Sequence, residues 1–256
     1  MITSTSNTQI KNVINLIKKS KDRKAQGLFV VEGKRMFEET PKERIHSLFV
    51  SESFERANKD SLRGYAYELV ADDVFSHMSD TKTPQGVMAL VKMSEYSIED
   101  MLKGGNPLIM ILENLQDPGN LGTIIRTAEG AGVDGIIMTS GTVDIYNPKV
   151  IRSTMGAMYR MKYAYTDNLK EAAAFLKGRG ITTYAAHLQG AVDYVTCDYK
   201  KGTAFFIGNE GNGLTDEATA LADRKIIIPM MGKLESLNAA VSGAVLMYEA
   251  ARQRRA

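Results

Sequence analysis

Five near-continuous apolar runs in the second half of the chain restrict its fold more than any other sequence feature. They are PLIMILE (107–113), GIIMT (135–139), TTYAAH (182–187), TAFFIG (203–208) and KIIIP (225–229). Strands of parallel sheets are buried on both faces and therefore read as unbroken apolar runs. Helical periodicity fills the intervals, at 120–131, 147–157, 168–178, near 214–222 and in a long final helix at 236–254. This half is therefore expected to be α/β, with a mostly parallel sheet that carries helices on both faces.

A smaller N-terminal α/β domain is expected before this region. Apolar residues recur at helical spacing over 7–20, at Ile10, Val13, Ile14 and Ile17. Short strands are predicted over LFVVEG (28–33), SLFVSE (47–52) and GVMALVK (86–92). The polar stretch SEYSIEDMLKGGN (94–106) is typical of a boundary. We therefore expect an N-terminal domain at 1–93, a linker at 94–106 and a second domain at 107–256.

Membrane, disulfide and metal-binding classes are disfavoured by composition. No apolar run reaches the ~20 residues needed to cross a bilayer, and the N-terminal segment has no apolar stretch like that of a signal peptide. The single cysteine, Cys197, excludes an intrachain disulfide, and the three histidines lie far apart in sequence. We therefore expect a cytoplasmic protein with no membrane partner and no metal.

Positive charge is concentrated near the N-terminus, although the net charge of the whole chain is only +2. Residues 1–44 hold ten Lys or Arg against five Asp or Glu, and five of these cations fall within seven positions: Lys18, Lys19, Lys21, Arg23 and Lys24. The cluster is either a solvated helix end or a patch that contacts phosphates, for which Lys and Arg are the natural donors.

A glycine-rich loop, GNEGNGL (208–214), follows the apolar run at 203–208. A phosphate-binding P-loop needs a lysine after its last glycine, but Leu214 follows Gly213. A dinucleotide fingerprint needs the spacing G-x-G-x-x-G, and these glycines run G-x-x-G-x-G. Glu210 would also repel a pyrophosphate. The loop is either a tight turn or a site for a ligand that is neutral or cationic at this point.

The segment DPGNLGTIIRTAEGAGVDG (117–135) combines a turn with a helix. Asn120 is a suitable N-cap, and Arg126 points away from the apolar face of the helix. Gly122 and Gly130 align with Arg126 at four-residue spacing, although glycine costs about 1 kcal/mol against alanine inside a helix. Arg126 is therefore either a solvated side chain or one that a partner approaches closely.

The C-terminal segment IIIPMMGKLESLNAAVSGAVLMYEAARQ (226–253) predicts a strand, a loop and a slender helix. Ser236 can cap this helix, and small residues follow it. Asn238 would lie past that cap, where helix formation does not require a polar residue. Its side chain is therefore a candidate for function.

These segments, in this order and spacing, resemble the three motifs of the SpoU/TrmH family of RNA 2′-O-ribose methyltransferases in the SPOUT superfamily. NPKVIRSTMGAMYRM (147–161) is similar to the family's serine-glycine-alanine stretch, and the N-terminal segment looks like the substrate-binding domain of many members. The resemblance covers nearly the whole chain. Its departures, at Ala239 and at Gly243-Ala244, touch no position with side-chain chemistry.

The resemblance implies a C-terminal trefoil knot, a homodimer and S-adenosylmethionine as cofactor. The cofactor-binding residues would be Leu188, Gly208, Asn209, Glu210, Gly211, Ile228, Met230, Leu237 and Asn238. The catalytic residues would be Arg126, Asn120, Glu210, Ser236 and Asn238. RNA would be held by Lys18, Lys19, Lys21, Arg23, Lys24, Arg126 and Arg152.

The function expected from this resemblance is methylation of a ribose 2′-OH in structured RNA, with ribosomal RNA favoured by the N-terminal domain. Alternatives are a tRNA 2′-O-methyltransferase and a non-catalytic RNA-binding factor in ribosome assembly. A nicotinamide-dependent oxidoreductase is disfavoured by the glycine spacing of the loop. Arginine stays protonated below a pH of about 12, so Arg126 is expected to clamp an RNA phosphate rather than act as a base.

Overall fold

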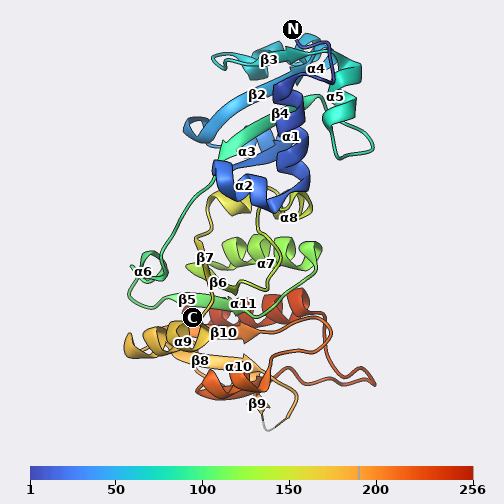
Figure 1. The fold of residues 1–256 in the computed structure, drawn as a ribbon. Helices are drawn as coiled ribbons and strands as arrows, with labels where there is room; N and C mark the ends of the chain where they lie inside the picture. Colours follow the sequence, from blue (N-terminus) through green and yellow to red (C-terminus); the bar gives the residue numbers. More distant parts are fainter. Residues whose placement is uncertain (190, 256) are drawn as a thin grey trace. The chain divides into compact units, whose positions relative to one another are not determined.

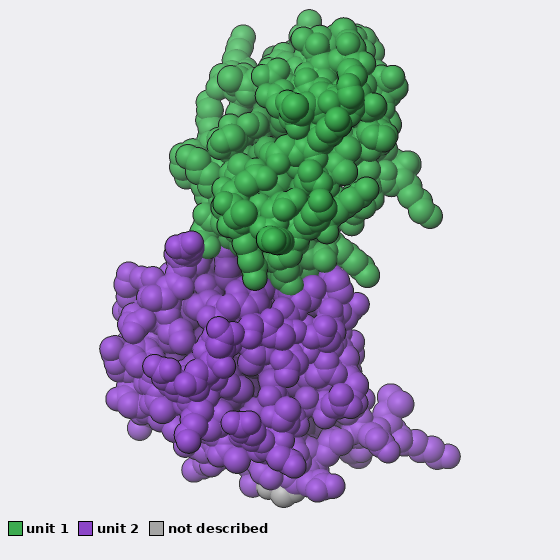
Figure 2. Space-filling model, viewed as in Figure 1, with its two compact units in different colours: residues 1–94, 144–159 green, residues 95–143, 160–256 purple. Residues whose placement is uncertain are grey.

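Two compact units make up the protein, whose computed structural model describes residues 1–189 and 191–255 (Figure 1). The first unit comprises residues 1–94 and 144–159, and the second comprises 95–143 and 160–256 (Figure 2). The sequence places 144–159 in the second domain, but this segment packs in the first unit. Its Tyr146 ring lies 4.5 Å from the ring of Phe29, which explains the attachment.

The first unit is built on a four-stranded sheet in the order β1-β4-β2-β3. These strands are β1 (Leu28–Glu32), β2 (Ile45–Ser51), β3 (Glu68–Val70) and β4 (Val87–Lys92). Strand β4 is antiparallel to β1 and β2, whereas β3 is parallel to β2. The helices are α1 (Thr8–Lys18), α2 (Ser20–Gln26), α3 (Lys34–Glu39), α4 (Glu52–Ala57), α5 (Asp72–Met78) and α8 (Pro148–Thr154), with 3₁₀ turns at Lys42–Arg44, Lys59–Leu62 and Ala157–Tyr159.

One predicted helix of this unit is two helices. The apolar spacing predicts a helix over 7–20, but α1 ends at Lys18 because Lys19 has an extended backbone, and α2 begins at Ser20. The predicted apolar face is buried: Ile10, Val13 and Leu16 are each 0 % exposed and pack in a core with Phe49 and Phe75. The break at Lys19 changes the direction of the chain and so the position of the cations that follow.

The second unit contains a seven-stranded sheet in the order β7-β6-β5-β10-β8-β11-β9, and every pair of neighbouring strands is parallel. The strands are β5 (Leu108–Leu112), β6 (Gly135–Thr139), β7 (Tyr163–Thr166), β8 (Thr182–Ala186), β9 (Val192–Asp193), β10 (Thr203–Ile207) and β11 (Arg224–Ile227). The five apolar runs are five of these strands. Strands β7 and β9 were not predicted, because only Tyr163 of the edge strand β7 is buried and β9 has two residues.

Helices cover both faces of this sheet, as the sequence predicts (Figure 1). They are α6 (Ile98–Met101), α7 (Pro118–Ala131), α9 (Leu169–Gly178), α10 (Asp216–Leu221) and α11 (Ala239–Arg255), with a 3₁₀ turn at Tyr194–Thr196. Ile109 and Ile111 of β5 pack in one core cluster with residues of α9 and α10. Met110, which alternates with them, lies instead beside Gly243 of α11. No helix in the described part of the chain is long and apolar enough to span a membrane.

Candidate active site

A cavity of about 450 Å³ lies beyond the carboxyl ends of β8, β10 and β11. Such an edge is the usual ligand site of parallel α/β sheets. The cavity is lined by residues from four stretches: 186–189, 207–214, 226–230 and 235–239, together with Asp216 and Ser242. Eight of the predicted cofactor residues are in this lining: Leu188, Gly208, Asn209, Glu210, Gly211, Ile228, Met230 and Leu237. Asn238, the ninth, is not, whereas Ser236 is.

The glycine-rich loop 208–214 is a tight hairpin closed by its own backbone. The N–H of Asn209 donates to the carbonyl of Gly213 at 3.0 Å, and the N–H of Gly213 donates back at 2.9 Å. A Cβ on Gly208 would lie 2.1 Å from the carbonyl carbon of Gly213, a contact that no side chain can relieve. Gly213 has φ of +68°, a conformation that favours glycine. Two of the three glycines are therefore required by the turn itself.

The carboxylate of Glu210 holds the loop that follows β5. Oε2 accepts a hydrogen bond from the backbone N–H of Gln116 at 3.1 Å. Oε1 accepts from the N–H of Asp117 and from Nδ2 of Asn120, each at 2.9 Å. Partial burial would raise the pKa of Glu210, but these hydrogen bonds outweigh it and lower the pKa below its ordinary value. Glu210 is therefore ionised at neutral pH and organises the loop around it.

Asn120, which donates to Glu210, also accepts a hydrogen bond from Asn238 at the start of the C-terminal helix. Its Oδ1 accepts from Nδ2 of Asn238 at 3.1 Å, and Oδ1 of Asn238 accepts from the N–H groups of Ala240 and Val241. Asn238 is therefore the cap of α11, and the prediction that Ser236 caps this helix is wrong. The N-cap of α7 also differs from the predicted one, because Asp117 rather than Asn120 caps this helix. Glu210, Asn120 and Asn238 form one hydrogen-bonded chain from three distant segments.

The charge of the lining limits what the cavity can bind. No lysine or arginine occurs among the described lining residues, which include the carboxylates Glu210, Asp216 and Glu235. A phosphate or pyrophosphate would be repelled here, whereas a cation would be favoured. No cluster of three or more His, Cys, Asp or Glu suited to a metal ion occurs within residues 1–189 and 191–255.

Arg126 is not part of the hydrogen-bonded chain. It is exposed on α7, and no hydrogen bond or ion pair joins it to another residue in the described ranges. Gly122, predicted to share its open face, is buried, whereas Gly130 is exposed and lies beside the hydroxyl of Tyr248. The guanidinium is therefore available to a partner, but only one of the two glycines leaves space near it.

The predicted RNA-binding cations divide into two groups. Lys18, Lys19, Lys21 and Lys24 are exposed. Arg23 is only 4 % exposed and forms an ion pair with Asp144, so the prediction that it contacts RNA is wrong. Its place on the buried side of the short helix α2 could not be foreseen while 7–20 was expected to be one helix. Arg152 is half-buried, with its guanidinium 3.7 Å from the carboxylate of Asp80.

Sequence reasoning singled out neither the lining carboxylates Asp216 and Glu235 nor three further residues that contact the predicted ones. Gln116 contributes a backbone N–H, which no side-chain pattern reveals. Asp117 was recognised only as turn chemistry, although an Asp before Pro118 is also a standard helix-cap signal. Asp144 gave no signal, because its partner Arg23 lies 121 residues away.

Two known protein families match this chain. Residues 107–248 match the SpoU rRNA Methylase family, and residues 7–89 match the MRM3-like substrate binding domain. The chain therefore belongs to the SpoU methylase family.

Two of three relatives match nearly the whole chain, and the third matches about three fifths of it. The 23S rRNA (guanosine(2553)-2′-O)-methyltransferase RlmP of Bacillus subtilis is 32 % identical over 96 % of this chain and 97 % of its own length. The tRNA (guanosine(18)-2′-O)-methyltransferase of Thermus thermophilus is 41 % identical over 61 % of this chain and 81 % of its own. An AdoMet-bound rRNA methyltransferase from Sinorhizobium meliloti has a TM-score of 0.86 at 31 % identity, covering 98 % of this chain and 97 % of that one.

Proposed function

We propose that the protein transfers a methyl group from S-adenosylmethionine to a ribose 2′-OH in ribosomal RNA. The observation that carries this proposal is the cavity, whose described lining residues include no lysine or arginine, beside the hydrogen-bonded chain Glu210–Asn120–Asn238. Ribosomal RNA is preferred because the RlmP relative aligns with 96 % of this chain, including the first unit. The tRNA relative aligns with only 61 % of it.

The residues of the cavity fit S-adenosylmethionine. A volume of about 450 Å³ is within the range of roughly 300–1,000 Å³ usual for small-molecule sites. The cofactor supplies an electrophilic methyl group on a positively charged sulfonium, which the carboxylates of the lining tolerate. Ile228, Met230 and Leu237 provide apolar surface, and the loop 208–211 provides backbone groups for hydrogen bonding.

The protein's own residues mainly position the ribose. Asn120 is already oriented by Glu210 and Asn238, so its amide is preorganised beside the cavity. Arg126 clamps the RNA phosphate next to the target ribose with its planar guanidinium. The ribose oxygen would gain the methyl group while the bond from that methyl to the sulfonium sulfur breaks and leaves a neutral thioether. The proton of the hydroxyl would pass to the phosphate or to a water. Ser236, exposed in the lining, adds a hydroxyl to the substrate side.

RNA is held, in this proposal, by exposed lysines of the first unit. Lys18, Lys19, Lys21 and Lys24 flank the contact between Ser20 and Asp144. Lys149 is exposed at the start of α8, a few residues after Asp144. Asp22 offsets only part of this positive charge, so the surface suits a phosphate backbone. Arg152 adds a cation that already has an acidic partner.

The remaining features proposed for this protein concern its assembly. We propose that it acts in the cytoplasm as a homodimer and that its C-terminal segment forms a trefoil knot. The dimer is supported by two exposed apolar side chains on α11, Val241 at 47 % and Tyr248 at 48 % exposure. Their helix packs on α7, which carries Arg126, so a dimer through α11 would lie near the site.

The enzymatic function is tested by separating cofactor binding from methyl transfer. We expect calorimetry to detect S-adenosylmethionine binding by the wild type and by Arg126→Ala alike. Methyl transfer to ribosomal RNA should fall by about 100-fold in Arg126→Ala, because the clamp that orients the ribose is lost. Arg224→Ala removes an exposed arginine at the opposite end of β11 and should leave transfer unchanged.

Two outcomes would overturn the proposal. Absence of S-adenosylmethionine binding by the wild type would remove the enzymatic function altogether. Cofactor binding and RNA binding without transfer would instead indicate an RNA-binding factor in ribosome assembly that has lost catalysis.

A further inference from the structure

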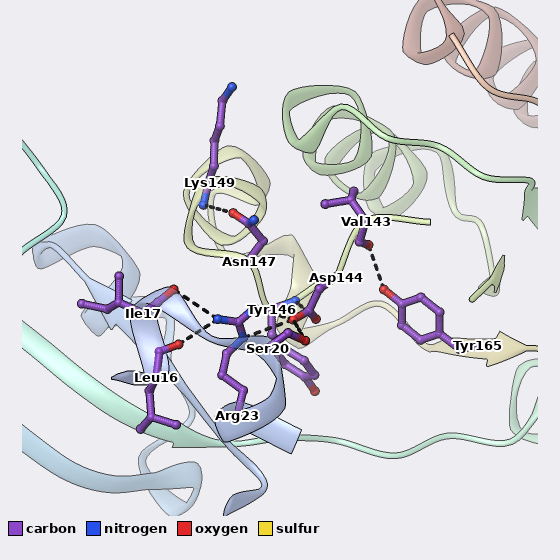
Figure 3. A network of polar contacts seen from close by, with 10 residues as sticks. All are labelled: Leu16, Ile17, Ser20, Arg23, Val143, Asp144, Tyr146, Asn147, Lys149 and Tyr165. Carbon is purple, nitrogen blue, oxygen red and sulfur yellow. Dashed lines mark hydrogen bonds and ion pairs between the residues drawn. The ribbon is translucent and has the colours of Figure 1, made fainter. Parts of the chain in front are cut away.

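The buried guanidinium of Arg23 is held by a network within the first unit (Figure 3). Nη1 donates to the carbonyls of Leu16 at 2.8 Å and Ile17 at 3.1 Å. Nε and Nη2 donate to Oδ2 of Asp144 at 3.1 and 2.5 Å, and the hydroxyl of Ser20 donates to the same oxygen at 2.8 Å. A guanidinium that is only 4 % exposed is costly unless its charge is paired and its donors are satisfied, and here four of its five N–H groups have acceptors, one of them an ionised carboxylate.

Asp144 is thereby fixed on both of its carboxylate oxygens. Oδ1 accepts from the backbone N–H of Tyr146 at 2.9 Å, while Oδ2 takes the contacts from α2. Asp144 is the first residue of the segment 144–159 that belongs to the first unit. The residue before it, Val143, belongs to the second unit and is joined to it by one peptide bond.

The residues just before Asp144 are hydrogen-bonded to the loop that binds the carboxylate of Glu210. The N–H of Val143 donates to the carbonyl of Leu115 at 2.8 Å, and Nε2 of Gln116 donates to the carbonyl of Gly141. The hydroxyl of Tyr165 donates to the carbonyl of Val143 at 2.9 Å (Figure 3). Segment 140–143 is therefore hydrogen-bonded to residues 115–116, beside the backbone N–H groups of Gln116 and Asp117 that bind Glu210.

We propose that Arg23 is a positioning residue for the Glu210 loop: by fixing Asp144 it orders segment 140–143, which in turn holds the backbone of Leu115 and the side chain of Gln116. Anchoring one end of a short segment removes conformational freedom that would otherwise oppose its hydrogen bonds. Arg23 touches neither cofactor nor substrate in this role. The inference rests on the proposed methyltransferase function for its effect on catalysis, but not for its effect on the loop.

The test compares single and double replacement of the buried pair. Arg23→Met and Asp144→Leu each leave an unpaired charge and should lower the melting temperature. The double variant leaves none, so its melting temperature should recover. If Arg23 positions the loop, kcat should still be lower by about tenfold in the double variant, with KM for RNA within about twofold of wild type. Arg23→Lys should retain part of kcat, because lysine can still donate to Asp144.

Hydrogen exchange provides a second measurement that does not depend on activity. Backbone N–H groups of residues 113–117 and 140–143 should exchange faster in the double variant than in the wild type. Arg63→Met, which removes an exposed guanidinium from the first unit, should leave exchange and kcat unchanged.

The outcomes separate the two proposals. A double variant with wild-type kcat, or with unaltered exchange over both segments, would overturn the positioning role. If the wild type transfers no methyl group, the proposed function fails, and the exchange comparison still decides whether Arg23 orders the loop.

Discussion

Glu210 stands in a glycine-rich loop, at a position where a phosphate-binding protein would place no negative charge. Its carboxylate accepts from two backbone N–H groups and one side-chain amide, all from residues 116–120. The charge therefore has a partner inside the protein. At the scale of the residue, this explains why a carboxylate is preferable to an amide here.

Replacement of Glu210 by glutamine should weaken the site without changing its size. All three partners are donors, and a glutamine amide would present N–H groups to at least one of them. Leaving such a group unsatisfied costs about 1–3 kcal/mol, so the affinity for S-adenosylmethionine should fall by roughly tenfold in calorimetry. Glu217→Gln, on the exposed side of α10, is the matched control. Equal affinities for the two variants would contradict the role given to Glu210.

The lowered pKa of Glu210 also predicts a pH dependence of stability. Because the folded-state pKa lies below the ordinary value of 4.5, the stabilisation is complete above that value and is lost as the pH falls through the lowered pKa. The gap in melting temperature between wild type and Glu210→Gln should thus stay constant from about pH 8 to about pH 5 and narrow below it. A difference in melting temperature that narrows between pH 8 and pH 6 would contradict a lowered pKa of Glu210.

Loop 208–214 shows, at the scale of the element, that glycines in one motif differ in their purpose. Gly208 lies against the backbone of Gly213 and Leu214, and Gly213 has a positive φ. Gly211 has neither constraint, since the nearest atom to its Cβ position would be 3.5 Å away. The hairpin therefore depends on the first and last glycines.

Alanine substitutions at Gly208 and Gly211 should separate these purposes. Gly208→Ala requires the backbone at Gly213 to move, which should disrupt the hairpin and reduce cofactor affinity by at least about tenfold. Gly211→Ala serves as its control and should bind the cofactor nearly as well as the wild type. Calorimetry on both variants checks this, and an intact site in Gly208→Ala would refute the backbone argument.

The chain as a whole passes between its two units more than once. Residues 95–143 belong to the second unit, 144–159 to the first, and 160–256 again to the second. The first unit is thus joined to the second at three points of the sequence, rather than by the single linker that composition suggested. Segment 144–159 belongs to the first unit because Tyr146 packs against Phe29 and Asp144 pairs with Arg23.

The proposed dimer is a property of the whole molecule and can be tested on α11. The wild type should have about twice the 28.2 kDa mass of one chain in sedimentation equilibrium. The double variant Val241→Asp/Tyr248→Asp should be monomeric, because it places two charges in a desolvated interface. Val195→Asp changes an equally exposed valine outside α11 and should remain dimeric. A monomeric wild type would exclude the dimer.

Periodicity was sufficient for the parallel α/β sheet of the second unit, whereas the resemblance to the SpoU/TrmH motifs supplied the eight predicted residues that line the cavity. The apolar runs specified five strands, and β5, β6, β8 and β10 are mostly buried, because burial on both faces produces an unbroken apolar run. In the fifth strand, β11, only Ile226 is buried. The glycine spacing and Glu210 excluded phosphate ligands before any geometry was known. The edge strand β7 gave a weaker signal in the sequence, since only one of its four residues, Tyr163, is buried.

The sequence by itself determined the α/β class and the parallel sheet, because hydrophobic pattern is a local property of the chain, and the resemblance of its motifs to the SpoU/TrmH family indicated the segments that line the cavity. Tertiary structure alone decided which polar groups meet. Arg23 reads as one of five cations until Asp144 is brought to it, and Asn238 reads as a free side chain until Asn120 accepts from it. Hydrogen bonds between residues separated by more than 100 positions depend on how the chain returns to itself, and no local pattern carries that information.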